Sequence, residues 1–145
     1  MTFKIKFIDL FCGIGGFHQA LNKYNTECVM ACDIDKNCRE IYQQNYGITP
    51  HKNIKDINEK NIPDFDILCA GFPCQSFSNG GKKKSLNDSR GTLFEDILRI
   101  ANEKTPKFMF LENVKHIKKI DNGNTFNHII KRINETGYYV NNENH

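Results

Sequence analysis

The sequence predicts a doubly wound α/β fold with a mostly parallel sheet. Short apolar runs alternate along the chain with segments in which apolar residues recur every three or four positions, the pattern of strands followed by helices. Several runs are continuously apolar, as in parallel strands covered by helices on both faces. The chain has 145 residues, 39% of them hydrophobic, and a net charge of +3, which suits one globular domain and argues against global disorder.

Two strand–helix pairs are expected in the first third of the chain. Residues 5–11 form an apolar strand candidate that ends at a glycine-rich turn, and apolar side chains of residues 17–24 follow with the spacing of one helix face. Residues 27–32 are a second strand candidate, and residues 38–46 carry the apolar stripe of a second helix. Asp35 can cap that helix.

The rest of the chain continues the alternation after a polar connection over residues 47–65. A buried strand, a glycine-rich loop, a helix, another buried strand and a last helix are expected, in that order, at residues 66–70, 71–90, 93–101, 107–114 and 126–133. Gly137 is a plausible C-cap of the last helix.

Cysteine usage and hydropathy indicate a cytoplasmic protein without a membrane segment. No signal peptide is recognisable, and no apolar run approaches the roughly 20 residues of a membrane span. The six cysteines are therefore expected to be reduced thiols, either buried small hydrophobes or functional groups. No Cys-x-x-Cys pair is present and the histidines lack zinc-ligand spacing, so no metal site is expected.

The predicted topology places the candidate functional loops together. Doubly wound sheets bind ligands at the carboxyl ends of their strands. The loops over residues 11–16, 33–35, 71–90 and 112–115 should therefore share one edge.

The first of these loops is compatible with a nucleoside ligand. Glycines at 13, 15 and 16 allow a tight turn and close approach of a ligand to the backbone, although the spacing matches neither a dinucleotide site nor a phosphate loop. Asp33, about twenty residues on, could accept hydrogen bonds from ribose hydroxyls. A plain turn, with Asp33 or Asp35 serving only as a helix cap, is the alternative reading.

Cys74 and Glu112 are the candidate catalytic residues. Cys74 follows a buried strand in a glycine-rich loop, where a thiolate could act as a nucleophile, although an inert thiol is the alternative. Glu112 ends the next apolar strand, and partial desolvation there would favour its protonated form and proton donation beside Cys74. Alternatively, Glu112 accepts hydrogen bonds from backbone amides at a helix start.

Four motifs resemble the cytosine-5 DNA methyltransferases, most closely the bacterial restriction–modification members. They are Phe-Ile-Asp-Leu-Phe-Cys-Gly-Ile-Gly-Gly-Phe at residues 7–17, Gly-Phe-Pro-Cys-Gln-Ser-Phe-Ser at 71–78, Asp-Ser-Arg-Gly-Thr-Leu-Phe at 88–94 and Glu-Asn-Val at 112–114. Their order and spacing match the family over nearly the whole chain. The resemblance implies the Rossmann-like fold of S-adenosylmethionine-dependent methyltransferases.

The resemblance also implies a cofactor site for S-adenosylmethionine. The cofactor would lie over the loop at 11–16, with its ribose on Asp33 and its adenine near Ile34 and Asn53. The full set of cofactor residues that the resemblance implies is Phe11, Gly13, Gly15, Asp33, Ile34, Asn53, Ile54, Pro73 and Leu93. Family members often carry aspartate where this chain has Asn53, and the amide oxygen can still accept from the adenine amino group, so weaker binding is expected.

The reaction implied by the family is methylation of C5 of a cytosine flipped out of double-stranded DNA. Cys74 would add to C6 while Glu112 protonates or hydrogen-bonds N3. The loop between the two motifs would close on DNA. The DNA and loop candidates are Gln75, Ser76, Ser78, Lys82, Lys83, Lys84 and Arg90, and the lysine run is either a phosphate contact or a merely solvated loop.

Length is the main departure from the family. Family members are much longer and carry, after the Glu-Asn-Val strand, a Gln-x-Arg-x-Arg motif, a target-recognition domain and C-terminal motifs. Residues 1–145 therefore match the N-terminal part of the cofactor-binding catalytic domain, without a recognition domain and with a sheet incomplete on its C-terminal side. We expect a catalytic half completed by a second polypeptide; a truncated fragment that only binds S-adenosylmethionine, or a transfer-RNA cytosine-5 methyltransferase relative, is the alternative.

Overall fold

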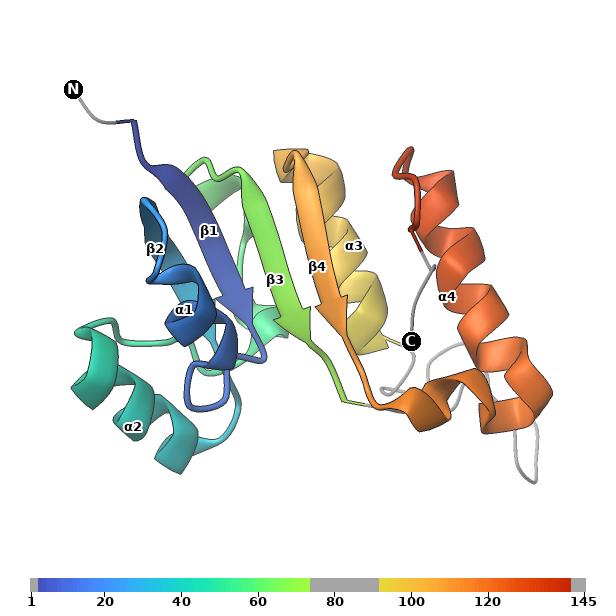
Figure 1. Ribbon diagram of the computed structural model, residues 1–145, viewed down its shortest axis with the longest axis horizontal. Coiled ribbons are helices and arrows are strands. Elements are labelled where there is room, and N and C mark those ends of the chain that lie inside the picture. Colours follow the sequence, from blue (N-terminus) through green and yellow to red (C-terminus); the bar gives the residue numbers. More distant parts are fainter. Residues whose placement is uncertain (1–2, 74–91, 142–145) are drawn as a thin grey trace.

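The computed structural model describes residues 3–73 and 92–141. Within them, four parallel strands form one sheet in the order β2-β1-β3-β4 (Figure 1). The strands are β1 (Ile5–Leu10), β2 (Thr26–Cys32), β3 (Ile67–Gly71) and β4 (Phe108–Glu112). Each lies where its apolar run predicts it, and the predicted parallel α/β sheet is confirmed.

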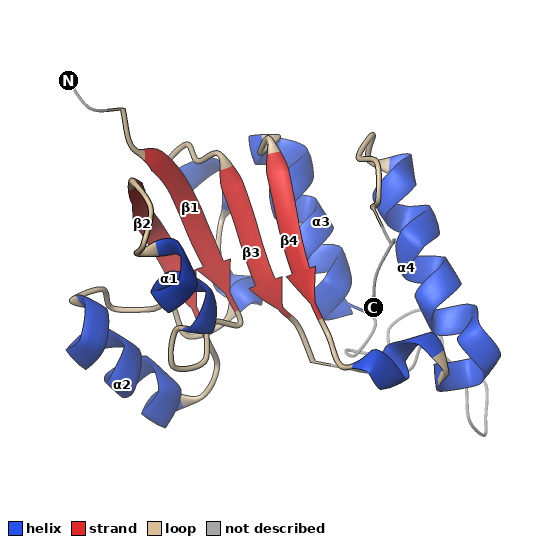
Figure 2. Ribbon diagram, viewed as in Figure 1, coloured by secondary structure: helices blue, strands red, loops and turns tan. Residues whose placement is uncertain are grey.

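Helices lie on both sides of the sheet, which confirms the doubly wound arrangement (Figure 2). The first pair, α1 (Gly16–Leu21) and α2 (Lys36–Tyr46), follows β1 and β2, and α3 (Thr92–Lys104) covers the opposite face. The remaining helices are η1 (Ile54–Asp56), η2 (Glu59–Asn61), η3 (Lys115–Lys118), η4 (Ile120–Gly123) and α4 (Asn124–Glu135). No helix in the described residues is long and apolar enough to span a membrane.

The strands are added to the sheet on one side of β1 first and then on the other. From β1 the chain moves outward to β2 and then to His51, which forms a parallel bridge with Cys32. It then crosses back through η1 and η2 to β3 on the other side of β1, and continues to β4. The order of the strands therefore reverses between β1 and β3, and sheets of this kind bind ligands at the carboxyl ends of the two strands on either side of such a switch point.

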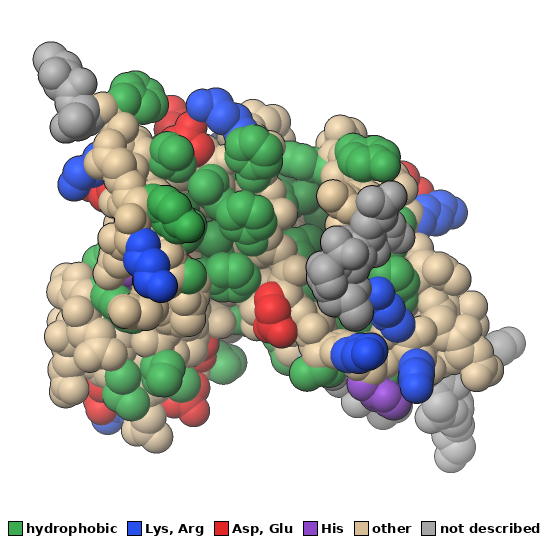
Figure 3. Space-filling model, in the orientation of Figure 1, with side chains coloured by type: hydrophobic (Ala, Val, Ile, Leu, Met, Phe, Trp, Pro, Cys, Tyr) green, Lys and Arg blue, Asp and Glu red, His purple; other side chains and the backbone are tan. Residues whose placement is uncertain are grey.

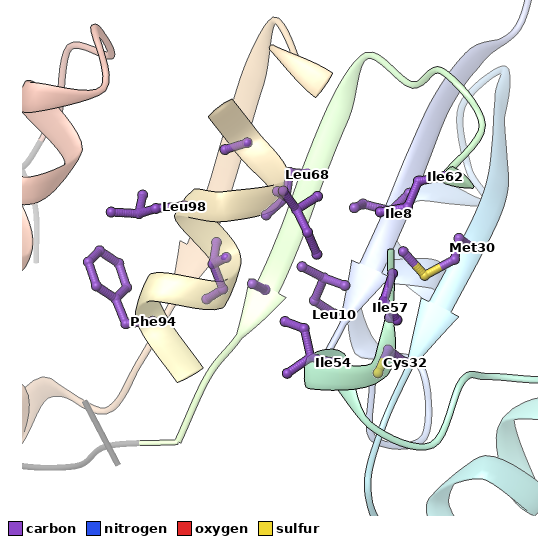
Figure 4. Packing of buried hydrophobic residues seen from close by; sticks show 14 of the residues in the cluster. Ile8, Leu10, Met30, Cys32, Ile54, Ile57, Ile62, Leu68, Phe94 and Leu98 are labelled. Carbon is purple, nitrogen blue, oxygen red and sulfur yellow. The ribbon is translucent and has the colours of Figure 1, made fainter. Parts of the chain in front are cut away.

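The larger core cluster lies between the sheet and α3 (Figure 4). Alternate strand residues such as Ile8, Leu10 and Leu68 point into this cluster, because side chains alternate between the two faces of a strand, and Phe94 and Leu98 of α3 belong to the same cluster. Each of these five side chains is almost completely buried, which corresponds to roughly 1.5–3 kcal/mol of hydrophobic stabilisation apiece. This core fixes the strands whose ends carry the candidate site.

The first helix differs from its predicted form. It ends at Leu21, so Tyr24 lies outside it and is 70% exposed. Its one buried residue is His18, which the apolar spacing did not select. The reason is a tertiary contact: His18 stacks on the ring of Tyr46 from α2, with ring centroids 3.9 Å apart.

The strand β4 is buried on one face only, so the prediction of a fully buried strand is wrong there. Phe108 and Phe110 are 61% and 47% exposed, whereas Met109 and Leu111 pack against the main core. Figure 3 shows hydrophobic side chains gathered over the part of the sheet that α1 leaves uncovered. The strand lies at an edge of the described sheet, with α3 on its other face.

Candidate active site

Four segments that carry predicted site residues meet at the carboxyl edge of the sheet. All strands run in the same direction, so the glycine loop after β1, the turn after β2, Phe72–Pro73 after β3 and Glu112 at the end of β4 lie along one edge (Figure 1). This confirms the predicted grouping for the described parts of these loops. The edge includes the switch point between β1 and β3.

The glycine loop is tied to the second strand by a carboxylate. Gly13 has a φ of +53°, and its N–H donates to Oδ2 of Asp33 at 2.8 Å. The N–H of Cys12 donates to the carbonyl of Cys32 at 3.0 Å. The loop therefore has a fixed position relative to the end of β2.

Gly15 is required by the close approach of α2. Its φ is +99°, and a Cβ atom there would lie 2.2 Å from the ring of Tyr46. The Tyr46 hydroxyl donates to the carbonyl of Gly15 at 3.2 Å. At Gly13, by contrast, a Cβ atom would meet nothing within 4 Å, so that glycine borders open space.

The roles of the two aspartates that follow β2 are now distinct. Asp35 caps α2, since its Oδ1 accepts from the N–H of Cys38 at 2.9 Å. Asp33 instead joins the two loops, accepting from Gly13 through Oδ2 and from the N–H of Asp35 through Oδ1 at 2.8 Å. Ile34 between them is 78% exposed.

The predicted adenine-contact segment forms the single turn η1. Asn53 caps this turn, with its Oδ1 accepting from the N–H of Lys55 at 3.1 Å. Ile54 is 3% exposed and belongs to the main core, so its side chain faces away from a ligand at this edge. Asn53 is thus the side chain of this pair that could touch a cofactor.

Glu112 lies directly beside the end of β3. It pairs in register with Gly71, and its Oε2 lies 3.4 Å from the position of a Cβ atom on that glycine. Glu112 is an exposed residue, so the part of the chain that the structure describes does not supply the expected desolvation. The prediction that the end of β4 neighbours the strand leading to Cys74 is confirmed.

Asn113 is a site residue that sequence reasoning missed. Its Nδ2 donates to the carbonyl of Phe72 at 2.8 Å, so the segment after β3 is tied to the end of β4. Phe72 packs on Phe94 of α3 with ring centroids 5.6 Å apart. Pro73 is exposed and Leu93 is half-buried against the core. The Glu-Asn-Val motif did contain a signal for Asn113, since an asparagine that follows a buried strand can donate to backbone groups of the adjacent segment.

The remaining predicted residues lie outside the described part of the chain. They are Cys74, Gln75, Ser76, Ser78, Lys82, Lys83, Lys84 and Arg90. Their roles remain predictions from the sequence.

A buried polar network beneath the glycine loop was not predicted. Asp9 of β1 is fully buried, and its Oδ2 accepts from the Tyr42 hydroxyl at 3.2 Å. The same hydroxyl lies 2.7 Å from Nδ1 of His18. Burial raises the pKa of Asp9 from 3.8 to about 7, with a further increase from nearby Asp33, while the Tyr42 hydrogen bond only partly offsets it. Asp9 therefore holds a proton at neutral pH far more readily than an exposed aspartate does.

Three of the cysteines on the strands and the glycine loop are buried thiols. The sequence predicted buried, reduced thiols for some of the six cysteines. Cys12, Cys32 and Cys69 are buried and free. Burial raises the pKa of each thiol, to about 12 for Cys32 and Cys69. A thiol with such a pKa carries almost no thiolate at neutral pH and is a poor nucleophile.

In residues 3–73 and 92–141, no cluster of His, Cys, Asp or Glu could hold a metal ion.

A basic surface lies next to Glu112. Lys115, His116, Lys118 and Lys119 are all exposed, on η3 and the residue that follows it. Figure 3 shows lysine or arginine and histidine side chains gathered over η3, beside acidic atoms at the end of β4. We call these four residues the η3 basic surface.

The fold and the tied glycine loop define the class as a Rossmann-like, S-adenosylmethionine-dependent methyltransferase fold. A solved Dnmt2 methyltransferase of S. pombe superposes with a TM-score of 0.71 at 27% identity, covering 88% of this chain and 42% of that one. A DNA modification methyltransferase encoded within an E. coli prophage also gives 0.71, at 26% identity, covering 91% and 38%. The chain belongs to the C-5 cytosine-specific DNA methylase family, whose family model matches residues 5–143.

Curated relatives are Type II methyltransferases. M.HhaI of Haemophilus parahaemolyticus is 53% identical over 134 residues, covering 92% of this chain and 41% of that protein. M1.ScrFI of Lactococcus lactis subsp. cremoris is 49% identical over 143 residues, covering 96% and 36%. The chain thus spans about two fifths of the length of these relatives. Membership of a methyltransferase family implies the use of S-adenosylmethionine in general.

Proposed function

We propose that this chain belongs to an enzyme that transfers a methyl group from S-adenosylmethionine to C5 of cytosine in double-stranded DNA, within a restriction–modification system. The observation that carries the proposal is the register of β3 and β4, which sets the Glu112 carboxyl group beside Gly71, three residues before Cys74. Methylation by the whole protein is the test: labelled methyl groups from S-adenosylmethionine should appear in duplex DNA as 5-methylcytosine, and label in RNA alone would favour the transfer-RNA alternative.

The described residues fit S-adenosylmethionine. Asp33 is partly exposed and retains lone pairs for ribose hydroxyls beside the open space at Gly13, and the exposed Ile34 offers an apolar surface for the base. Asn53 would accept from the adenine amino group, with Phe11, Gly15, Ile54, Pro73 and Leu93 completing the site. When bound, the cofactor supplies an electrophilic methyl group on a sulfonium centre.

Cys74 and Glu112 act on the flipped cytosine in the proposed reaction. The Cys74 thiolate forms a bond to C6, and the electron pair of the C5–C6 double bond becomes available at C5 as Glu112 donates a proton or hydrogen bond at N3. C5 then accepts the methyl group. The C5 proton then passes to a base such as a water molecule, N3 returns its proton to Glu112, and the C6–S bond breaks to release the Cys74 thiolate and restore the ring.

The contribution of Asp33 to cofactor binding can be measured directly. Asp33→Ala should lower affinity for S-adenosylmethionine by at least about 10-fold, because hydrogen bonds to a charged group contribute roughly 1.5–3 kcal/mol each. Titration calorimetry on this chain gives the affinity. Asp35→Ala is the matched control: it removes the α2 cap and lowers the melting temperature, but should leave the affinity within about 2-fold. Equal losses in both variants would reduce Asp33 to a structural role.

The η3 basic surface is proposed to contact DNA phosphates, together with the lysines at 82–84. Replacing Lys115, Lys118 and Lys119 by alanine should reduce the slope of log affinity against log salt by about 0.9 for each lost phosphate contact. Fluorescence anisotropy with a duplex gives this slope. Alanine at Lys4, Lys6 and Lys23, exposed lysines near the amino ends of the strands, is the control of equal charge and should leave the slope unchanged. Identical slopes in both triple variants would exclude contact between the η3 basic surface and DNA phosphates.

A second polypeptide that carries the Gln-x-Arg-x-Arg motif and a recognition domain is part of the proposal, because the relatives are more than twice as long as the region that residues 1–145 match. Sequencing the DNA downstream of codon 145 tests this part. An adjoining frame with Gln-x-Arg-x-Arg and a recognition domain would support it. If none adjoins, the proposal of a second polypeptide encoded beside this chain is wrong.

A further inference from the structure

Arg99 of α3 forms an unusually complete set of contacts with the segment after Asn53. Its Nη2 donates to the carbonyl of Ile54 at 3.0 Å and its Nη1 to the carbonyl of Ile57 at 2.9 Å. It also forms an ion pair with the carboxylate of Glu59, and its Nε bonds Oδ1 of Asp96 at 3.2 Å. A single side chain thus joins α3 to Ile54, Ile57 and Glu59, which lie 45, 42 and 40 positions earlier in the sequence.

These contacts require the shape of arginine. The guanidinium presents several N–H groups in one rigid plane, so it can bond two carbonyls and a carboxylate at once. A lysine ammonium in the same place would carry the charge but could not hold all of the acceptors in this fixed geometry. The Arg99 side chain is 30% exposed, which leaves it only partly screened by water.

The held segment is the turn that orients Asn53. The carbonyl of Ile54 accepts both from Arg99 and from the N–H of Ile57, which closes η1. The side chains of Ile54 and Ile57 are anchored in the core on the other side. The turn is therefore held from two sides, and the N–H of Lys55 that it presents keeps the Asn53 Oδ1 in place.

We propose that Arg99 is a positioning residue that makes the cofactor site selective for adenine, by fixing the η1 turn and with it the acceptor oxygen of Asn53. This inference rests on the proposed function. The Asn53 amide can rotate to offer a donor or an acceptor, and only a fixed turn commits its oxygen to one direction. Arg99 touches no ligand itself; it acts through the backbone of Ile54.

The test compares two ligands in calorimetry with the full chain. The probes are S-adenosylhomocysteine and its 6-deamino counterpart, in which hydrogen replaces the adenine amino group. The wild type should prefer the adenine form by about 5-fold, the value of one neutral hydrogen bond. In Arg99→Lys the preference should fall below about 2-fold. Arg132→Lys is the matched control, because Arg132 also joins α3 to another element, through paired bonds of 2.8 and 2.7 Å to Glu95.

The ratio of affinities separates positioning from a general structural effect. Loss of stability alone would weaken both ligands equally and leave the ratio unchanged, and such a result in Arg99→Lys would overturn the inference while the proposed function stands. A wild type that binds neither ligand would overturn the proposed cofactor site itself. If Arg99→Lys does not fold, Arg99→Gln removes the paired donation to the carbonyls of Ile54 and Ile57, and an unchanged preference there would equally overturn the inference.

Discussion

A Cys74→Ser variant is expected to form no covalent complex with duplex DNA that contains 5-fluorocytosine. Fluorine at C5 cannot leave as the proton does, so a nucleophile that has added to C6 remains attached. A thiol ionises far more readily than a hydroxyl and is the better nucleophile, so a serine at this position supplies almost no alkoxide to attack C6. The expected loss is complete within the sensitivity of a denaturing gel. The protein to use is the whole enzyme, with S-adenosylmethionine present.

The structure supplies a control cysteine for this experiment. Cys38 on α2 is a free thiol and half-buried, so Cys38→Ser tests the effect of removing a thiol far in sequence from the motif. Trapping should persist in that variant. A complex that still forms with Cys74→Ser would assign the nucleophile to another residue. Among the described cysteines, Cys12, Cys32 and Cys69 are poor candidates, because burial raises the pKa of each.

The grouping of the site loops at one edge of the sheet could be predicted from the sequence because it depends on local pattern and a general rule of topology. A mostly apolar run marked β1 and a continuously apolar run marked β3, and parallel sheets bring the carboxyl ends of their strands to one edge. That reasoning placed Glu112 beside the strand that leads to Cys74, and the pairing of Gly71 with Glu112 confirms the neighbourhood. The spacing did not decide which of Asp33 and Asp35 caps α2 and which remains available to a ligand, since either could serve as the cap.

The features that sequence reasoning missed all depend on contacts between distant segments. His18 is buried because Tyr42 and Tyr46 of α2 surround it, and these lie more than twenty residues away. The exposure of Phe108 follows from the edge position of β4, which an apolar run cannot reveal. No local pattern singles out Arg99, because its contacts form only where α3 lies against η1 and the segment that follows it.

The buried carboxyl group of Asp9 should make stability fall as pH rises. In the unfolded chain this carboxyl ionises near 3.8, whereas burial raises its folded pKa to about 7. Between these values the folded protein holds a proton that the unfolded chain has lost. The contribution of Asp9 to the free energy of unfolding is therefore fully present below about pH 4 and decreases through about pH 7, by at most about 4 kcal/mol at 1.4 kcal/mol per pH unit.

Asp9→Asn isolates this effect from the other titrating groups. Carboxylates such as Asp66, whose pKa is lowered by Lys107, stabilise the fold above their unfolded pKa and act in the opposite direction, as does His18, whose pKa burial lowers. They titrate in both proteins and largely cancel in the difference. Urea unfolding from pH 4 to pH 8 should show the variant gaining on the wild type as pH rises, since its neutral amide can still accept from the Tyr42 hydroxyl without ionising. Parallel stability curves would mean that Asp9 is ionised in the folded protein despite its burial, and that the network beneath the glycine loop is held by charge and not by a retained proton.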